Sequence, residues 1–289
     1  MQTQIPKPLL VIPNEWNLTD EQLYKIYSVE KNQASKLRKA KSGAERKGLY
    51  GPVYEEYFSQ LPFHPQFTVK NDSNKIQNRV DFQWHQLKPF MKKNGVFIEL
   101  GAGDCSFSKA LSDQFAKVYA LEVSEEITKD LNFPDNVECI IFDGFNIPFN
   151  TESIDVLYSN QLMEHLHPDD AIEQLTSIYN VLKTDGTYTC ITPNKLIGPA
   201  DISRFYTSDL DGFHLKEYSI SDLNRLFKKI GFSKVYVHIY SKGKYIFIPV
   251  FVLQVTEFLL SVFPSKIRKR IAQFSILNRL INAFVTAKK

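Results

Sequence analysis

The chain has 289 residues, of which 43% are hydrophobic and 23% charged, and its formal net charge is +3. This length allows one domain of ordinary size with accessory segments, and the composition is that of a globular protein. The small charge does not by itself indicate a nucleic-acid partner, and the N-terminus lacks the layout of a signal peptide. The three cysteines, Cys105, Cys139 and Cys190, show no metal-ligand spacing and indicate reduced thiols in a cytosolic chain.

Residues 1–93 are predicted to form a helical extension. An extended arm with three prolines is followed by a predicted helix from Thr19 to about Ala40. Further helices are predicted over 52–60 and 74–90. Residues 36–47 carry six positive charges and one acid. We interpret this run as a solvated helix face, with a surface that faces the acceptor or a phosphate as the alternative.

From Val96 onward the pattern alternates between strands and helices, which favours a parallel sheet with helices on both faces. Six strands are predicted over 96–100, 117–121, 137–142, 154–159, 187–192 and 232–240, and a last one over 282–288. The intervening helices are predicted over 106–115, 124–131, 169–182 and 219–230. We therefore expect an α/β domain over residues 94–289.

Residues 241–281 are predicted to be a helical insertion before the last strand. Residues 245–263 are strongly apolar, but Pro249, Gln254 and Glu257 interrupt them, which argues against a membrane-spanning helix. A basic run follows over 266–270. The segment is interpreted as a lid or homodimer surface packed on the sheet, or as an interfacial segment that contacts a membrane through 245–270.

The turn after the first strand carries the strongest local signal. Gly101 and Gly103 lie between a buried strand and a helical pattern, where glycines let a ligand approach the backbone and the helix N-terminus. A nicotinamide-type fingerprint requires a third glycine, but Ser106 occupies that position. The turn indicates a small-molecule cofactor of another kind.

Several motifs, in the right order over about residues 90–240, resemble the class I S-adenosylmethionine-dependent methyltransferases that act on small molecules, lipids and glycans. They include Glu99 to Cys105, Val118 to Glu122, Phe142 to Gly144, Ile154 to His165, and His214 to Ser219. The resemblance implies a doubly wound, Rossmann-like, mostly parallel sheet of seven strands with an antiparallel last strand. It also implies S-adenosylmethionine as cofactor, S-adenosylhomocysteine as product, and no metal.

Each cofactor residue has a physical reason for its predicted role. Glu122 is predicted to bind the two ribose hydroxyls, because a carboxylate accepts both at once. Buried Glu99 is expected to accept turn N–H groups or to reach the cofactor's amino group through water. Asp143 is predicted to contact the adenine, with a turn-capping role as the alternative. The predicted cofactor-binding set is Glu99, Gly101, Ala102, Gly103, Glu122, Asp143, Gly144 and Asn160, with Asn160 at the methionine end. Cys105 departs from the family by replacing a glycine.

The acceptor residues are predicted from the loops after the fourth and fifth strands, since ligands bind at that edge of such sheets. His165 and His214 are the predicted catalytic residues, because a hydroxyl acceptor needs a base near neutral pH. Arg204 suits a carboxylate, a phosphate or a sugar acid. The predicted substrate-binding residues are Asp201, Arg204 and Tyr206.

The sequence therefore predicts a cytoplasmic enzyme, in contact with the inner face of a membrane if 245–270 is interfacial. It is expected to methylate oxygen on a small-molecule, sugar or lipid-linked acceptor. The alternatives are N- or C-methylation, including quinone or RNA substrates, and a non-catalytic adenosylmethionine-binding protein. Nucleic acid is disfavoured, because no basic platform interleaved with aromatic residues is evident.

Overall fold

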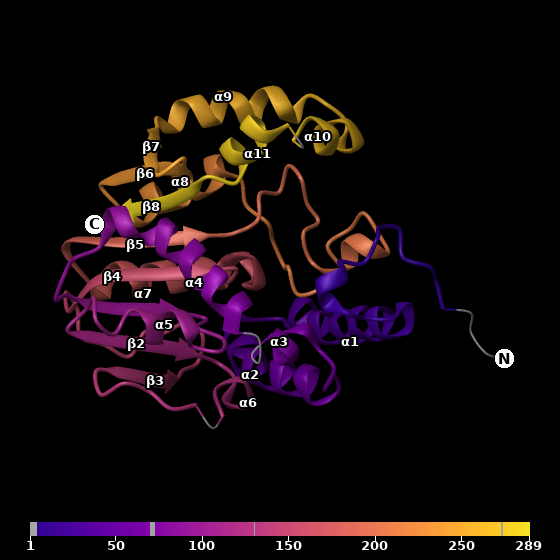
Figure 1. Ribbon diagram of the computed structural model, residues 1–289, viewed down its shortest axis with the longest axis horizontal. Helices are drawn as coiled ribbons and strands as arrows, with labels where there is room; N and C mark the ends of the chain where they lie inside the picture. Colours follow the sequence, from indigo (N-terminus) through magenta and orange to yellow (C-terminus); the bar gives the residue numbers. More distant parts are fainter. Residues whose placement is uncertain (1–4, 70–72, 130, 273) are drawn as a thin grey trace.

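The computed structural model describes residues 5–69, 73–129, 131–272 and 274–289, and a single eight-stranded sheet organises them (Figure 1). The strand order is β3-β2-β1-β4-β5-β8-β6-β7. The first five strands in this order pair in parallel, and β8 pairs antiparallel with both β5 and β6. The strands are β1 Val96–Leu100, β2 Lys117–Glu122, β3 Val137–Ile141, β4 Ile154–Asn160, β5 Leu182–Ile191, β6 Lys234–Ser241, β7 Lys244–Ile248 and β8 Phe284–Lys288.

The predicted fold class is confirmed, with one strand more than expected. β7 lies inside the predicted helical insertion and pairs antiparallel with β6. The two strands are joined through Lys242 and Gly243, whose φ angles of 48° and 76° are those of a type I′ hairpin turn. The remaining predicted strands are all present, with shifted ends for several of them.

The helices cover both faces and one edge of this sheet. They are α1 Asp20–Lys39, α2 Gly43–Ser59, α3 Pro65–Val69, α4 Ser73–Leu87, α5 Ser106–Ala110, α6 Glu125–Thr128, α7 Pro168–Val181, α8 Ile220–Ile230, α9 Val250–Ser261, α10 Ser265–Ile271 and α11 Ser275–Ile281. Short 3-10 turns lie at Asn14–Trp16, Lys88–Phe90, Met163–His165 and Ile202–Phe205. In Figure 1 the arrowheads of the parallel strands point toward α1–α3, whereas α9–α11 lie beside β6–β8. The predicted helix over 124–131 includes residue 130, which lies outside the described residues.

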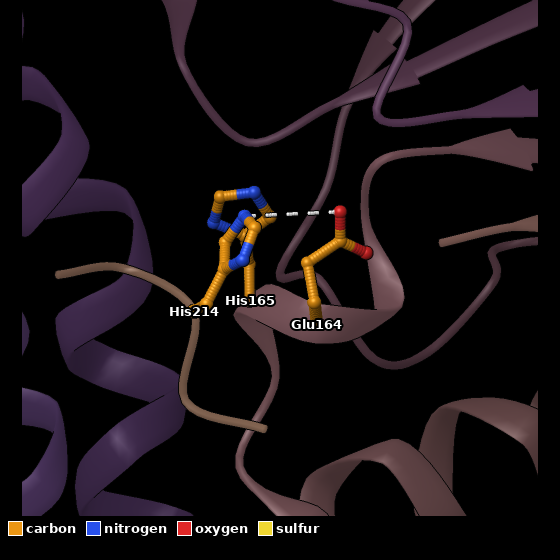
Figure 2. A group of neighbouring side chains, drawn as sticks. All are labelled: Glu164, His165 and His214. Atoms are coloured by element: carbon orange, nitrogen blue, oxygen red, sulfur yellow. Dashed lines mark ion pairs between the residues drawn. The ribbon is translucent and has the colours of Figure 1, made fainter. Parts of the chain in front are cut away.

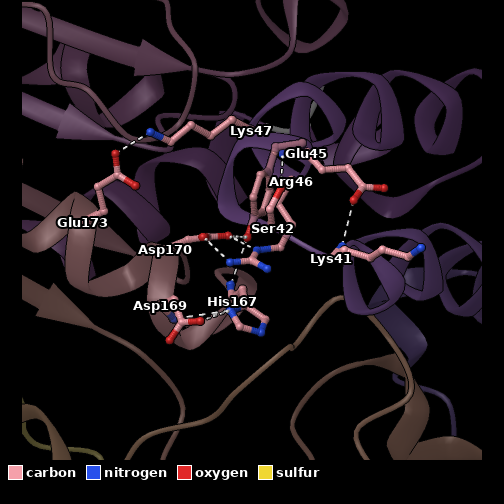
Figure 3. Close-up of polar contacts among 10 residues, drawn as sticks. Lys41, Ser42, Glu45, Arg46, Lys47, His167, Asp169, Asp170 and Glu173 are labelled. Atoms are coloured by element: carbon pink, nitrogen blue, oxygen red, sulfur yellow. Dashed lines mark hydrogen bonds and ion pairs between the residues drawn. The ribbon is translucent and has the colours of Figure 1, made fainter.

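Within the basic run over 36–47, Arg38, Arg46 and Lys47 contact other segments, whereas Lys39 and Lys41 are exposed, as expected for a solvated face. Arg46 forms a buried two-pronged ion pair with Asp170 of α7, with Nε–Oδ2 and Nη2–Oδ1 distances of 2.6 and 2.7 Å (Figure 3). Lys47 pairs with Glu173 on the same helix. Arg38 donates to the backbone carbonyls of residues 210, 211, 212 and 214. These charges hold α2 to α7 and α1 to the loop over residues 210–214.

Glu257, which interrupts the apolar run, ties α9 to the start of α8 and to the loop after β5. Its buried carboxylate accepts from the N–H groups of Ile220 and Ser221 at 2.7 and 2.9 Å, which are orphan donors at the start of α8. It also accepts from the Asn194 amide at 2.9 Å. One face of α9, with the buried residues Leu253, Glu257 and Leu260, is thus packed against the protein. No helix among the described residues is long and apolar enough to cross a membrane.

Candidate functional site

A cavity of about 500 Å³ lies at the carboxyl ends of β1, β2 and β4 and is closed by α1 and α2. This is the edge where open α/β sheets bind ligands, and the volume lies in the range of small-molecule sites. Among the predicted site residues, those that line it are Gly101, Gly103, Glu122, Gly144, Asn160, His165, Asp201 and Arg204. The fold thus brings eight of the predicted residues to one cavity.

The turn after β1 needs left-handed backbone at three positions. Gly101, Gly103 and Cys105 have φ angles of 68°, 55° and 56°. A Cβ on Gly103 would meet nothing within 4 Å, so its backbone is open to a ligand. Cys105 adopts the conformation that the family's glycine adopts without strain. Its side chain is fully buried and packs with Ala102 and Ala120, so the thiol does not narrow the cavity.

Glu122, at the end of β2, is held under this turn. Its Oε2 accepts from the Gly103 N–H at 2.9 Å, and its Oε1 accepts from the Val123 N–H at 2.8 Å. Burial raises the pKa of this carboxyl, and the backbone donors oppose that rise. A carboxylate on the cavity wall with two ordered oxygens is suited to receive a pair of hydroxyl groups.

Glu99 lies on a separate, smaller cavity of about 190 Å³, on the other side of the turn glycines. Burial raises its pKa to about 8, although the Ser108 hydroxyl donates to Oε2 at 2.5 Å. Gly101, Gly103 and Asn160 line both cavities, and Ala102 lines the smaller one. Arg79 of α4 also lines the smaller cavity, where it pairs with Asp104 at 2.5 Å. No sequence pattern pointed to Arg79, because this residue precedes β1.

Asp143 does not line either cavity. Its exposed carboxylate accepts from the N–H groups of Phe145 and Asn146 at 2.8 Å, and so caps its own turn. The predicted contact with adenine therefore has no support in the structure. The neighbouring backbone does face the cavity: Phe142 and Gly144 line it, and the Gly144 carbonyl accepts from Gln174 at 2.7 Å.

The two predicted catalytic histidines come together at the exit of β4. Their rings pack edge to face with centroids 4.9 Å apart, and Glu164 lies beside them (Figure 2). His165 lines the cavity, and its Nδ1 is 3.0 Å from the Tyr54 hydroxyl. Burial lowers its pKa well below the usual value, so the imidazole is neutral. His214 is buried behind it.

His214 and Glu164 form a polar layer under the cavity wall. Burial alone would lower the pKa of His214, but a 2.8 Å hydrogen bond to Glu217 and the nearby carboxylates raise it. Burial raises the pKa of Glu164 to about 7. Glu164, His165 and His214 each offer one ligand atom, and these atoms lie within 4.8 Å of one another. These three residues could hold a metal ion.

At the other predicted acceptor positions, two residues face the cavity and one does not. Asp201 lines it, and its buried Oδ2 has no hydrogen-bond partner among the described residues. Arg204 also lines it, with its guanidinium over the Trp16 and Phe205 rings. Tyr206 instead stacks on Tyr27 of α1, with centroids 4.6 Å apart, so its predicted acceptor contact is not supported.

The N-terminal helices supply cavity residues that the sequence did not reveal. Glu30 of α1 is buried on the wall, where its Oε1 accepts from the Phe213 N–H at 2.8 Å. Burial raises its pKa to about 7. Tyr54 and Tyr57 of α2 line the cavity and pack on Phe213 at 4.5 and 5.0 Å between centroids. Only the tertiary fold brings these residues to the sheet edge.

Comparisons with known proteins agree with this arrangement. Residues 98–190 match the family described as "Methyltransferase domain". No curated protein matches the sequence.

The fold is similar to three solved methyltransferase structures. A candidate O-methyltransferase from Nostoc punctiforme has a TM-score of 0.56 and 12% identity, over 95% of this chain and 71% of that one. A candidate histamine N-methyltransferase from Thermotoga maritima has a TM-score of 0.50 and 13% identity, over 91% and 99%. The phosphoethanolamine N-methyltransferase 1 of Haemonchus contortus, solved with phosphoethanolamine and S-adenosylhomocysteine, has a TM-score of 0.51 and 16% identity, over 86% and 50%. At these identities the likeness shows the fold alone.

Proposed function

We infer, from the premise that this chain is a class I S-adenosylmethionine-dependent methyltransferase, that it methylates a hydroxyl oxygen of a small sugar-like or lipid-linked acceptor. The observation that carries the proposal is one cavity lined both by the cofactor turn and by His165, Asp201 and Arg204. Donor and acceptor can therefore occupy one cavity, which methyl transfer requires.

The donor end is built by the first four parallel strands. The cofactor, when bound, supplies a sulfonium methyl group. Gly103 offers open backbone, Glu122 offers two carboxylate oxygens for the ribose, and Asn160 lines both cavities. Asn160 marks the passage between them, which suits a ligand whose adenosyl part lies in the larger cavity and whose amino-acid part reaches Glu99. These residues bind and orient the donor.

The acceptor end combines hydroxyl acceptors, aromatic rings and one cation. The unpartnered Oδ2 of Asp201 and the carboxylate of Glu30 can each accept hydrogen bonds from acceptor hydroxyls. Arg204 has no carboxylate partner among the ion pairs of the described residues, and it suits a phosphate or sugar-acid group. His165 lies between these groups and the turn, where it contacts the acceptor oxygen and can take its proton. His214 positions His165 from behind.

The same carboxylates support a second candidate, N-methylation of an amine. A Cβ built on Gly212 would collide with both Glu30 Oε1 and Asp201 Oδ2, so the two carboxylates approach each other across this residue. Two buried acids beside the rings of Tyr54, Tyr57 and other cavity aromatics would also stabilise an ammonium group.

We further propose that α9 and α10 bind an anionic membrane surface. Phe251, Val255 and Phe258 are 65%, 54% and 68% exposed and share one face of α9 by their spacing. The basic residues of 266–270 follow directly in α10. Apolar side chains beside basic ones suit an interface with anionic headgroups. This placement would bring lipid-linked acceptors to the enzyme.

Product analysis tests the acceptor proposal. The protein is incubated with methyl-labelled S-adenosylmethionine and a panel of sugar phosphates, lipid-linked sugars, phenols and primary amines, and the methylated atom is located by mass spectrometry. We expect label on oxygen and preference for anionic acceptors. Arg204→Gln should raise KM for anionic acceptors about tenfold or more and leave kcat nearly unchanged. Label on nitrogen alone would replace the first candidate with the second.

A further inference from the structure

We propose that Glu164, His165 and His214 bind a first-row divalent transition-metal ion just behind the acceptor side of the cavity, whose wall His165 lines. Glu164 and His165 are adjacent on the turn after β4, and His214 comes from the loop before α8 (Figure 2). The three ligand atoms lie within 4.8 Å of one another. The sequence shows no metal-ligand spacing, because His214 is far from the other two along the chain. The role given below to the ion rests on the proposed function, whereas its binding does not.

Each of the two histidines contacts a partner through Nδ1, which leaves its Nε2 to bind the ion. His214 contacts Glu217 through Nδ1 at 2.8 Å, which leaves Nε2. His165 contacts the Tyr54 hydroxyl through Nδ1 at 3.0 Å, which also leaves Nε2. Metal-binding histidines in proteins are commonly fixed in this way through their second nitrogen.

Glu164 provides the second, independent observation. It is fully buried, and its Oε2 accepts from the Thr192 hydroxyl at 2.8 Å. Its Oε1 is also buried but has no hydrogen-bond partner among the described residues. A buried carboxylate oxygen without a hydrogen bond destabilises the folded state, and a cation at the centre of the cluster would remove that destabilisation. Among the described residues neither Lys nor Arg pairs with Glu164; its ion-pair partner is His214, whose Nε2 lies 3.9 Å from Oε1 and so is too distant for a hydrogen bond.

The geometry is close to that of a bound ion. The distance from Glu164 Oε1 to His214 Nε2 is 3.9 Å. Ligands at about 2.1 Å from one ion lie about 3 to 3.5 Å apart, so side-chain movements of under about 1 Å would close the site. Two imidazoles and one carboxylate on one side of an ion favour Mn²⁺, Fe²⁺ or Zn²⁺ over Mg²⁺ or Ca²⁺, and leave positions for water or substrate.

The ion would bind the acceptor oxygen and favour its ionised form. The hydroxyl proton would leave to water. An oxygen lone pair would form the new bond to the methyl carbon, while the carbon–sulfur bond breaks and its electron pair stays on sulfur. The product is then a methyl ether and a neutral thioether. With the ion bound, His165 contacts the acceptor through the metal and does not take the proton itself.

Metal binding can be measured without the acceptor. Full-length protein is treated with a chelator, dialysed and titrated with Mn²⁺, and free Mn²⁺ is followed by electron paramagnetic resonance. We expect one ion per chain, displaced by Zn²⁺ and not by equimolar Mg²⁺. His214→Gln and Glu164→Gln should each weaken Mn²⁺ binding about a hundredfold or more, and Glu217→Gln about tenfold. His167→Gln is the matched control, because this histidine is close in sequence but outside the cluster, and it should bind Mn²⁺ like the unaltered protein.

Binding of S-adenosylhomocysteine by calorimetry checks that each variant is folded. Stoichiometric Mn²⁺ binding that persists in both His214→Gln and Glu164→Gln would overturn the proposal, as would no binding of Mn²⁺ or Zn²⁺ at millimolar concentration. Methyl transfer that survives the chelator, together with no ion binding, would overturn the metal site and leave the proposed function standing. Ion binding without transfer to any hydroxyl would contradict the proposed function and leave the metal site standing.

Discussion

Replacement of Arg46 by methionine should destabilise the protein by about 3 to 5 kcal/mol, because it leaves a buried charge without its partner. The side chains of Arg46 and Asp170 are only 6% and 2% exposed, and they share two hydrogen bonds of 2.6 and 2.7 Å. In the variant, Asp170 would keep a single side-chain donor, the Tyr50 hydroxyl at 3.1 Å. One neutral hydrogen bond contributes only about 0.5 to 1.5 kcal/mol, too little to offset the loss.

The measurement is urea unfolding followed by circular dichroism, with the free energy of unfolding extrapolated to water. Lys47→Met is the matched control, since its pair with Glu173 is 29% and 45% exposed and should contribute under about 1 kcal/mol. Arg46→Met/Asp170→Asn should recover part of the loss by removing the stranded charge. A single Arg46→Met variant within about 1 kcal/mol of the unaltered protein would refute the argument that this pair fastens α2 to α7.

Three further changes test the donor end, a buried acid and the exposed helix. Glu122→Gln should weaken S-adenosylhomocysteine binding about tenfold to a hundredfold, because charge-assisted hydrogen bonds to the ribose are lost. The affinity is measured by calorimetry. Asp143→Asn is the control and should change the affinity less than about threefold. Glu99 has a pKa of about 8 when folded, so the stability it contributes is present below about pH 4.5 and is lost as the pH rises toward 8. Unfolding curves of Glu99→Gln should therefore lack a component of up to about 1.4 kcal/mol per pH unit over this window. Phe258→Glu should reduce sedimentation with anionic vesicles several-fold.

Each of these expectations has a result that contradicts it. Equal affinities for Glu122→Gln and the unaltered protein would remove this residue from the donor site. Parallel pH profiles for Glu99→Gln and the unaltered protein would show that the acid is ionised in the fold. Vesicle binding that is unchanged in Phe258→Glu, or concentration-dependent dimers that this change disrupts, would favour a partner protein or a second copy over the membrane.

The parts of the structure that the sequence predicted correctly depend on local patterns. The parallel strands are predictable because their buried residues form short apolar runs, such as Phe97, Ile98 and Leu100 of β1, which only Glu99 interrupts. The glycine turn after β1 and the position of Glu122 at the end of β2 also follow from local patterns. The start of α2 was missed, because three glycines and Pro52 weaken its helical pattern, although Ser42 caps it at Glu45 N–H.

The acceptor wall could not be predicted, because it depends on contacts between segments far apart in the chain. Glu30 resembles an ordinary acid on an amphipathic helix, yet it is only 7% exposed and bonds to Phe213. Tyr206 follows Arg204 in a loop at the correct edge, yet its ring turns to α1. Position along a strand predicts which residues reach the carboxyl edge of the sheet, whereas the direction of a loop side chain requires the fold.

The hydrogen bonds from Arg38 to carbonyls of residues 210–214 bear on how the acceptor preference of such an enzyme can evolve. The N-terminal helices supply Glu30, Tyr54 and Tyr57 and also hold the loop that carries His214. The strand ends that build the donor site belong to another part of the chain. If Arg46, which fastens α2 to α7, is retained, exchange of residues 5–69 together with the 201–214 loop is expected to alter acceptor choice in one step. Binding of the adenosyl part of the cofactor at the strand ends should be unchanged in the exchanged protein.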